Sequence, residues 1–185
     1  MRWDELFRDL EAQLEAASAT ELAAEVADRS RREAAMLTWV DRAREATGAR
    51  VSVRVSGAGV VDGVLREVGS QWLLVEEEAR RDALVPAAAV LAVGGLTSWS
   101  AAPGSAGHVV SRLGLGSALR GLARDRAAVS VSLVDGSVVD GTVDRVGQDF
   151  LEVSTHEPGE ARRQAEVRSV RTLPFAAVSV VRSRA

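Results

Sequence analysis

Hydrophobic and polar residues alternate along two stretches of the chain, as they do in a half-buried β-strand. Residues 51–55 and residues 129–133 each place Val or Leu at every second position, with mostly polar residues between them. A period of two puts the apolar side chains on one face of a strand and the polar side chains on the other. We therefore expect β-structure in two similar regions of the chain.

The two regions align with one another as an internal duplication. Residues 51–75 match residues 129–153 without a gap at an offset of 78 residues, and 11 of the 25 positions are identical. A second block, residues 85–90, matches residues 173–178 at an offset of 88. The order of the matches favours two copies of one fold over chance similarity in a Val-rich chain.

Turn and breaker residues divide each copy into short antiparallel strands. A Gly-rich or Asp-Gly turn follows the first strand, and Gly63 or Gly141 then falls where a bend in one long strand is expected. Pro86 and Pro174 each end a later strand, because proline cannot pair centrally. Each copy is predicted to hold about five bent strands, which suits a small β-barrel.

The first 47 residues show helical spacing instead. The pattern slips at residues 18–21, which also look like a capping box, so both one long helix and a helical hairpin fit it. Gly48 is expected to end the helical region. Its apolar stripe predicts a face for oligomerisation or for docking a partner, made of Trp3, Leu6, Phe7, Leu10 and Leu14.

Together these patterns predict an α+β protein in four parts. The parts are a helical N-terminal segment (1–48), a first small barrel (49–96), a linker with short helices (97–124) and a second small barrel (125–185). The hydrophobic core of so small a barrel is only marginally stable by itself. We therefore expect the barrels to pack against each other, against the helices or against a second subunit.

Composition removes most catalytic chemistry. The chain has no Cys, Lys, Tyr, Ile or Asn, so all 23 of its basic residues are Arg. The missing Cys and Lys exclude disulfides, thiolate metal sites, thiol nucleophiles and Schiff-base lysines. His108 and His156 lack metal-ligand spacing, and no GxSxG motif is present. We expect no catalytic residue, metal, cofactor or small-molecule substrate, and no enzyme.

Nucleic-acid binding is the alternative that the arginines leave open. The formal net charge of −3 argues against broad attraction to phosphate, although a local cluster of arginines still neutralises it. Residues 109–124 also resemble, faintly, a helix-turn-helix. The candidate nucleic-acid contacts are Arg112, Arg120, Arg124, Arg162, Arg163, Arg168 and Arg171.

The charged N-terminus lacks the apolar core of a signal peptide. The longest apolar stretch, residues 83–96, is too short and too broken by Pro86 and two glycines to cross a bilayer. A cytoplasmic location without membrane contact is therefore expected.

Residues 129–153 resemble the first motif of Sm-like barrels in their alternation, their turn glycine and Gly141 at the bend. The resemblance extends to the first copy and implies two five-stranded Sm-like β-barrels joined by a short helical linker. Where Sm-like proteins carry a base-contacting Asn, however, the chain has Leu73 and Leu151, which counts against RNA binding. The Val-Pro and Leu-Pro endings also resemble Src-homology-type and PRC-type barrels, and the N-terminal layout is similar to a protein family widespread in actinobacteria.

The sequence therefore predicts a non-enzymatic interaction or scaffold protein built on these tandem barrels. It is expected to form homo-oligomers or to dock a protein partner through its N-terminal helix. The alternative is a regulatory protein that binds RNA or DNA through its Arg-rich faces.

Overall fold

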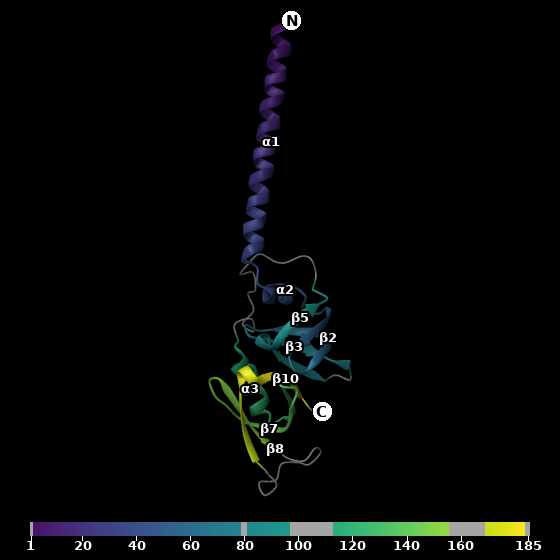
Figure 1. Cartoon of the computed structure of the whole chain (residues 1–185), viewed down its shortest axis with the longest axis vertical. Coiled ribbons are helices and arrows are strands. Elements are labelled where there is room, and N and C mark those ends of the chain that lie inside the picture. Colours follow the sequence, from purple (N-terminus) through teal and green to yellow (C-terminus); the bar gives the residue numbers. More distant parts are fainter. Residues whose placement is uncertain (1, 79–80, 97–112, 156–168, 184–185) are drawn as a thin grey trace. The chain divides into compact units, whose positions relative to one another are not determined.

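The structure, a computed structural model, describes residues 2–78, 81–96, 113–155 and 169–183 (Figure 1). The chain divides into two compact units, Met1–Thr38 and Trp39–Ala185. Among the described residues, the first unit contains one α-helix, and the second contains the strands, two shorter α-helices and two 3-10 turns.

The N-terminal region forms one long helix rather than a helical hairpin. Helix α1 (Arg2–Met36) runs through residues 18–21 without a break. A short helix α2 (Trp39–Glu45) follows, and Gly48, with a φ of +90°, ends the helical region as expected. Ala43 and Ala46 are buried in the core of the second unit, so α2 belongs to the sheet and not to α1.

Two similar sets of five strands follow, here called the first half (residues 39–96) and the second half (residues 113–183). Helix α3 (Leu115–Arg124) opens the second half as α2 opens the first. The strands of the first half are β1 (Arg50–Val55), β2 (Gly59–Val68), β3 (Trp72–Glu76), β4 (Asp82–Pro86) and β5 (Val90–Gly94). Those of the second half are β6 (Ala128–Leu133), β7 (Val138–Val146), β8 (Phe150–Thr155), β9 (Ser169–Pro174) and β10 (Val178–Ser183).

The expectation of two closed five-stranded barrels is wrong. All ten strands form one open antiparallel sheet in the order β5-β1-β2-β3-β4-β10-β6-β7-β8-β9. Two closed barrels would need β4 to pair with β5, and β9 with β10. Instead β4 pairs with β10 of the other half, where Leu84 lies opposite Val181 and Ala83 opposite Arg182. A strand edge exposes unpaired N–H and C=O groups, and here the other half satisfies those of β4.

The two bend glycines lie within single long strands, as the sequence predicts. Gly63 of β2 lies opposite Val51 of β1, and Gly141 of β7 lies opposite Val129 of β6. A Cβ atom at Gly63 would collide with the carbonyl oxygen of Glu76, and one at Gly141 with that of Ser154. Glycine is therefore required because the neighbouring strand approaches too closely for any side chain.

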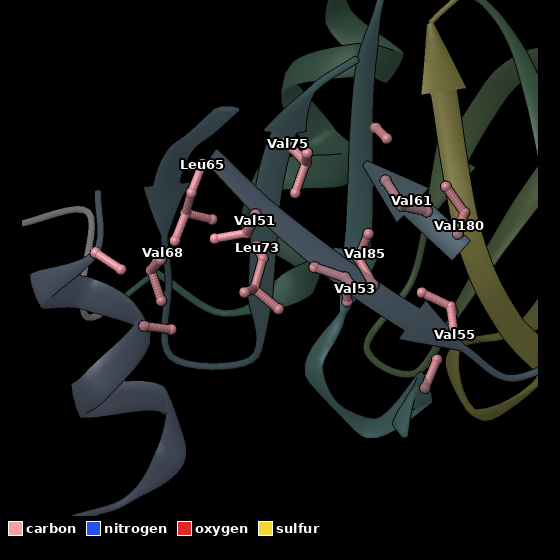
Figure 2. Packing of buried hydrophobic residues seen from close by; sticks show 14 residues of the cluster. Val51, Val53, Val55, Val61, Leu65, Val68, Leu73, Val75, Val85 and Val180 are labelled. Atoms are coloured by element: carbon pink, nitrogen blue, oxygen red, sulfur yellow. The ribbon is translucent and has the colours of Figure 1, made fainter. Parts of the chain in front are cut away.

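Each half has its own hydrophobic core, and the two cores share residues. Figure 2 shows the first core, where Val180 of β10 lies near valines of β1, β2 and β4. In the other direction, Trp72 and Leu84 of the first half belong to the second core. We call this β4–β10 junction the seam. Because apolar side chains cross it in both directions, we expect the two halves to fold as one cooperative body.

Candidate functional site

A groove of about 350 Å³ opens beside the seam. Helix α3 and β10 of the second half form one wall, and β2, β3 and β4 of the first half form the other. Its apolar lining includes Trp72, Leu74, Leu84, Leu122 and Val181. The volume lies at the lower end of the range for ligand-binding clefts, which is about 300 to 1,000 Å³.

Helix α3 lies in this position because its apolar residues point in two directions. Leu115 and Leu119, four residues apart, are buried in the second core, and α3 packs on β7. Ala118 and Leu122, also four apart, are only partly buried and line the groove. Residues spaced by four share one helix face, so α3 uses one face for the core and presents the adjacent one to the groove.

The indole of Trp72 holds the segment that leads into α3. Its Nε1 donates a hydrogen bond of 2.9 Å to the carbonyl oxygen of Leu113, just before α3. The same oxygen accepts bonds from the backbone nitrogen (3.2 Å) and the hydroxyl (3.1 Å) of Ser70. The only polar atom of the indole is thus already satisfied, and what Trp72 contributes to the groove is apolar.

Carboxylates surround the apolar lining. Glu67, Asp82 and Asp125 line the groove and are exposed. Arg124 Nε lies 3.8 Å from Asp125 Oδ1, and both side chains are well exposed, so this ion pair is weak. Across the described part of the chain, neither Glu67 nor Asp82 forms an ion pair. The groove therefore combines an apolar interior with an acidic rim.

The corresponding surface of the second half has the opposite character. Leu74 corresponds to Glu152 by the 78-residue offset, and Leu84 corresponds to Thr172 by the 88-residue offset. The strand registers agree, because Leu74 lies opposite Leu84 and Glu152 opposite Thr172. Sequence reasoning missed the groove, although these two apolar-to-polar differences between otherwise similar copies were its available signal.

Three of the seven predicted nucleic-acid contacts lie in the described part of the structure, on two different elements. Arg120 and Arg124 are exposed on α3, and Arg171 is exposed on the outer strand β9, opposite Val153. The remaining candidates, Arg112, Arg162, Arg163 and Arg168, lie outside the described residues.

The predicted helix face lies on α1, as expected from its spacing. Phe7 is 59% exposed there. The side chains of Trp3, Leu6, Leu10 and Leu14 are outside the described part of the structure. Further along α1, Leu22, Val26 and Met36 are also exposed.

No group of three or more acidic or histidine residues that could hold a metal ion occurs within residues 2–78, 81–96, 113–155 and 169–183. One carboxyl group in the described ranges has a clearly shifted pKa. The hydroxyl and backbone N–H of Ser137 bond to Asp135 and lower its pKa below the ordinary value. Asp135 lies in the β6–β7 turn, where this arrangement stabilises the turn.

Comparisons with known proteins add no relative: no protein-family model, curated protein or solved structure matches this chain. None of the helices in the described ranges has the length and apolar character needed to cross a membrane.

Proposed function

We propose that this protein is a non-enzymatic interaction protein that holds an apolar, positively charged segment of a partner protein in the groove beside the seam. The observation that carries this proposal is the apolar lining bounded by three exposed carboxylates. A cytoplasmic location remains part of the proposal.

The chemistry of the groove defines the partner. An apolar side chain of the partner would displace water from Leu74 and Leu122, which are partly exposed in the free protein. An Arg or Lys beside it would pair with Glu67 or Asp82. Phosphate would be repelled by the same carboxylates, so the groove gives no support to nucleic-acid binding.

Peptide display on the full chain tests the proposal. A random 12-residue peptide library is selected on the immobilised protein, and enriched sequences should combine Leu, Ile or Phe with Arg or Lys. A selected peptide carrying a fluorophore is then titrated with the wild type and with Leu74→Glu. Glu at this position is the residue that the second half carries at Glu152, on the equivalent strand, so the change suits the fold.

The expected result is a loss of peptide affinity of at least tenfold in Leu74→Glu and a smaller loss in Asp82→Asn. The matched control is Val138→Glu, because Val138 is an exposed valine on β7 that does not line the groove. Equal binding to the wild type and Leu74→Glu, or a library without enrichment, would refute the proposal.

Helix α1 supplies a second contact in this proposal, by pairing with α1 of another copy. The 4-3-4-3 spacing of a two-stranded coiled coil is present in α1, and Phe7 is exposed. The residues with this spacing are Trp3, Phe7, Leu10, Leu14 and Ala17. Full-length Leu10→Ser, Leu14→Ser should have a lower mass than the wild type in sedimentation velocity, with Glu11→Ser as the control. An unchanged mass would remove α1 from the proposal and leave the groove untouched.

A further inference from the structure

Within the described residues, one side of β5 and one side of β9 have no partner strand. Because the chain is duplicated, each of these two edge strands has an equivalent strand in the other half. Strand β9 corresponds to β4, and β5 corresponds to β10, by the same offset of 88 residues. Inside the molecule, β4 and β10 pair with each other. The free edges of β5 and β9 therefore correspond to the edges of β10 and β4, which pair with each other.

The register of the β4–β10 pair can be transferred to a pairing of β9 with β5 by the 88-residue offset. Val181 lies opposite Leu84 in the seam, and these residues correspond to Val93 of β5 and Thr172 of β9. The inner pairings agree with this, because Val93 lies opposite Val53 as Val181 lies opposite Val131. Pairing of β9 with β5 would place Thr172 opposite Val93.

Beside β5 lies a hollow that corresponds to half of the seam groove. It has a volume of about 270 Å³ and is lined by residues of α2, β5 and the segment after β5, including Trp39, Arg42 and Leu91. In the seam groove, α3 and β10 form the equivalent wall, and strands of the preceding half form the opposite one. No strand supplies that opposite wall beside β5 in the described part of one chain. In the described residues of one chain, the hollow thus lacks the wall that the seam groove has.

Apolar side chains lie exposed at both edges. Leu91 is the unpaired residue of an irregularity in β5 and is 65% exposed, whereas its counterpart in β10, Ser179, is fully buried. On the other edge, Val170 of β9 is 55% exposed, and its counterpart Asp82 lines the seam groove. Solvent-facing edges normally carry charged residues that prevent pairing. Strand β5 has no charged residue and β9 has only Arg171, so the exposed apolar side chains indicate surfaces that become covered.

We propose that a second copy of this chain lays its β9 along β5, so that Thr172 of the partner subunit lies opposite Val93. The contact repeats the seam between molecules. It also closes the hollow at Trp39, because the β8–β9 surface of the second copy forms the missing wall. The two surfaces differ, so the contact is head-to-tail and leaves one β5 and one β9 free for further copies. Such a contact continues to a closed ring or to an open chain.

The contact between molecules is weaker than the seam. In the seam, Arg182 donates two hydrogen bonds to Glu77, whereas the corresponding positions are held by Gly94 in β5 and Thr155 in β8. Ala92 likewise replaces Val180, which is buried in the first core. Association should therefore be reversible and should increase with protein concentration.

Cysteine pairing tests this register directly, since the chain contains no cysteine of its own. Val93→Cys and Thr172→Cys are made in separate full-length chains, and the two proteins are mixed under mild oxidation. Opposed residues on antiparallel strands have Cα atoms about 4.5 to 5.5 Å apart, within reach of a disulfide. A mixed dimer should form on a non-reducing gel faster than in the control mixture of Val93→Cys with Val138→Cys, where Val138 is exposed on β7.

The same mixture is repeated in chains that carry Leu10→Ser, Leu14→Ser, so that pairing of α1 does not bring the cysteines together. The proposed strand contact and the proposed helix contact then fail or succeed separately. A second measurement is sedimentation velocity of Ala92→Lys, Thr172→Lys, which places charges on both free edges at residues exposed in the single chain. This variant should have a lower mass than Val138→Lys. Cross-linking no faster than in the control, or an unchanged mass in the Lys variant, overturns the proposal.

Discussion

The ion pair across the seam provides a direct test of whether the two halves form one body. Arg182 Nε and Nη2 lie 2.8 and 3.1 Å from the two carboxylate oxygens of Glu77. The two side chains are only 24% and 15% exposed. The perturbation is Arg182→Met, which retains most of the aliphatic stem and removes the charge. Glu77→Gln and the double variant complete a mutant cycle.

The expected size of the effect follows from this geometry. Opposite charges about 4 Å apart attract by about 4 kcal/mol at an effective dielectric constant of about 20. Desolvation of both groups and the loss of side-chain freedom offset part of this attraction. Exposed pairs contribute about 0 to 1 kcal/mol, and loss of one partner of a buried pair costs about 3 to 5 kcal/mol. For this mostly buried pair we expect Arg182→Met to cost about 2 kcal/mol and the coupling to be about 1 to 2 kcal/mol.

Urea unfolding of all four proteins, followed by tryptophan fluorescence and by circular dichroism, measures these free energies. The matched control is the cycle between Arg145 and Glu152, which lie 3.6 Å apart within the second half. Arg145 is 75% exposed, so its coupling should be below about 0.5 kcal/mol.

A coupling across the seam no larger than that of the control would refute the reasoning. Two separate transitions in the wild type would do so as well, because they would show that the halves unfold independently.

Three further predictions concern single elements. Gly141→Ala and Gly63→Ala should each cost about 1 to 3 kcal/mol or more in urea unfolding, because the added methyl group meets a carbonyl oxygen of the next strand; stability equal to the wild type would contradict the close approach. Leu119→Ala should cost about 2 to 5 kcal/mol, because this α3 side chain is fully buried, and a loss below about 1 kcal/mol would show that α3 does not pack on the sheet. The folded pKa of Asp135 lies below its unfolded value, so its contribution to stability is present above the unfolded pKa and is lost as the pH falls through the folded one. Ser137→Ala removes the hydroxyl donor and keeps the backbone N–H, so it should raise that pKa in a carboxyl NMR titration; an unchanged pKa would exclude the hydroxyl hydrogen bond as a cause.

Local structure followed closely from the sequence. The alternation in residues 51–55 and 129–133 predicted strands, and β1 and β6 lie there. The bend at Gly141 and the Asp-Gly turn at residues 135–136 were also predicted correctly, and Gly136 has a φ of +86°. These features depend on period, backbone freedom and turn chemistry, which act over a few neighbouring residues.

The pairing of the last two strands of each half was not predicted correctly: closed barrels would pair β4 with β5 and β9 with β10, whereas β4 pairs with β10. An edge strand satisfies its backbone groups equally well by closing its own barrel or by joining another sheet, and hydrophobic alternation is the same in both cases. The groove was missed for a related reason. Leu74 and Leu84 look like ordinary strand residues until α3 and β10, which are distant in sequence, are placed beside them.

The sequence alone therefore determined the duplication, the strands, their turns and the helical N-terminus, because each depends on short-range patterns. It also excluded thiol and lysine chemistry, because those residues are absent. The tertiary structure decided that β4 pairs with β10, that the two cores exchange side chains, and that an acidic rim surrounds an apolar groove. The reason is physical: backbone hydrogen bonds and apolar burial between distant segments select one pairing among several that local preferences leave equal.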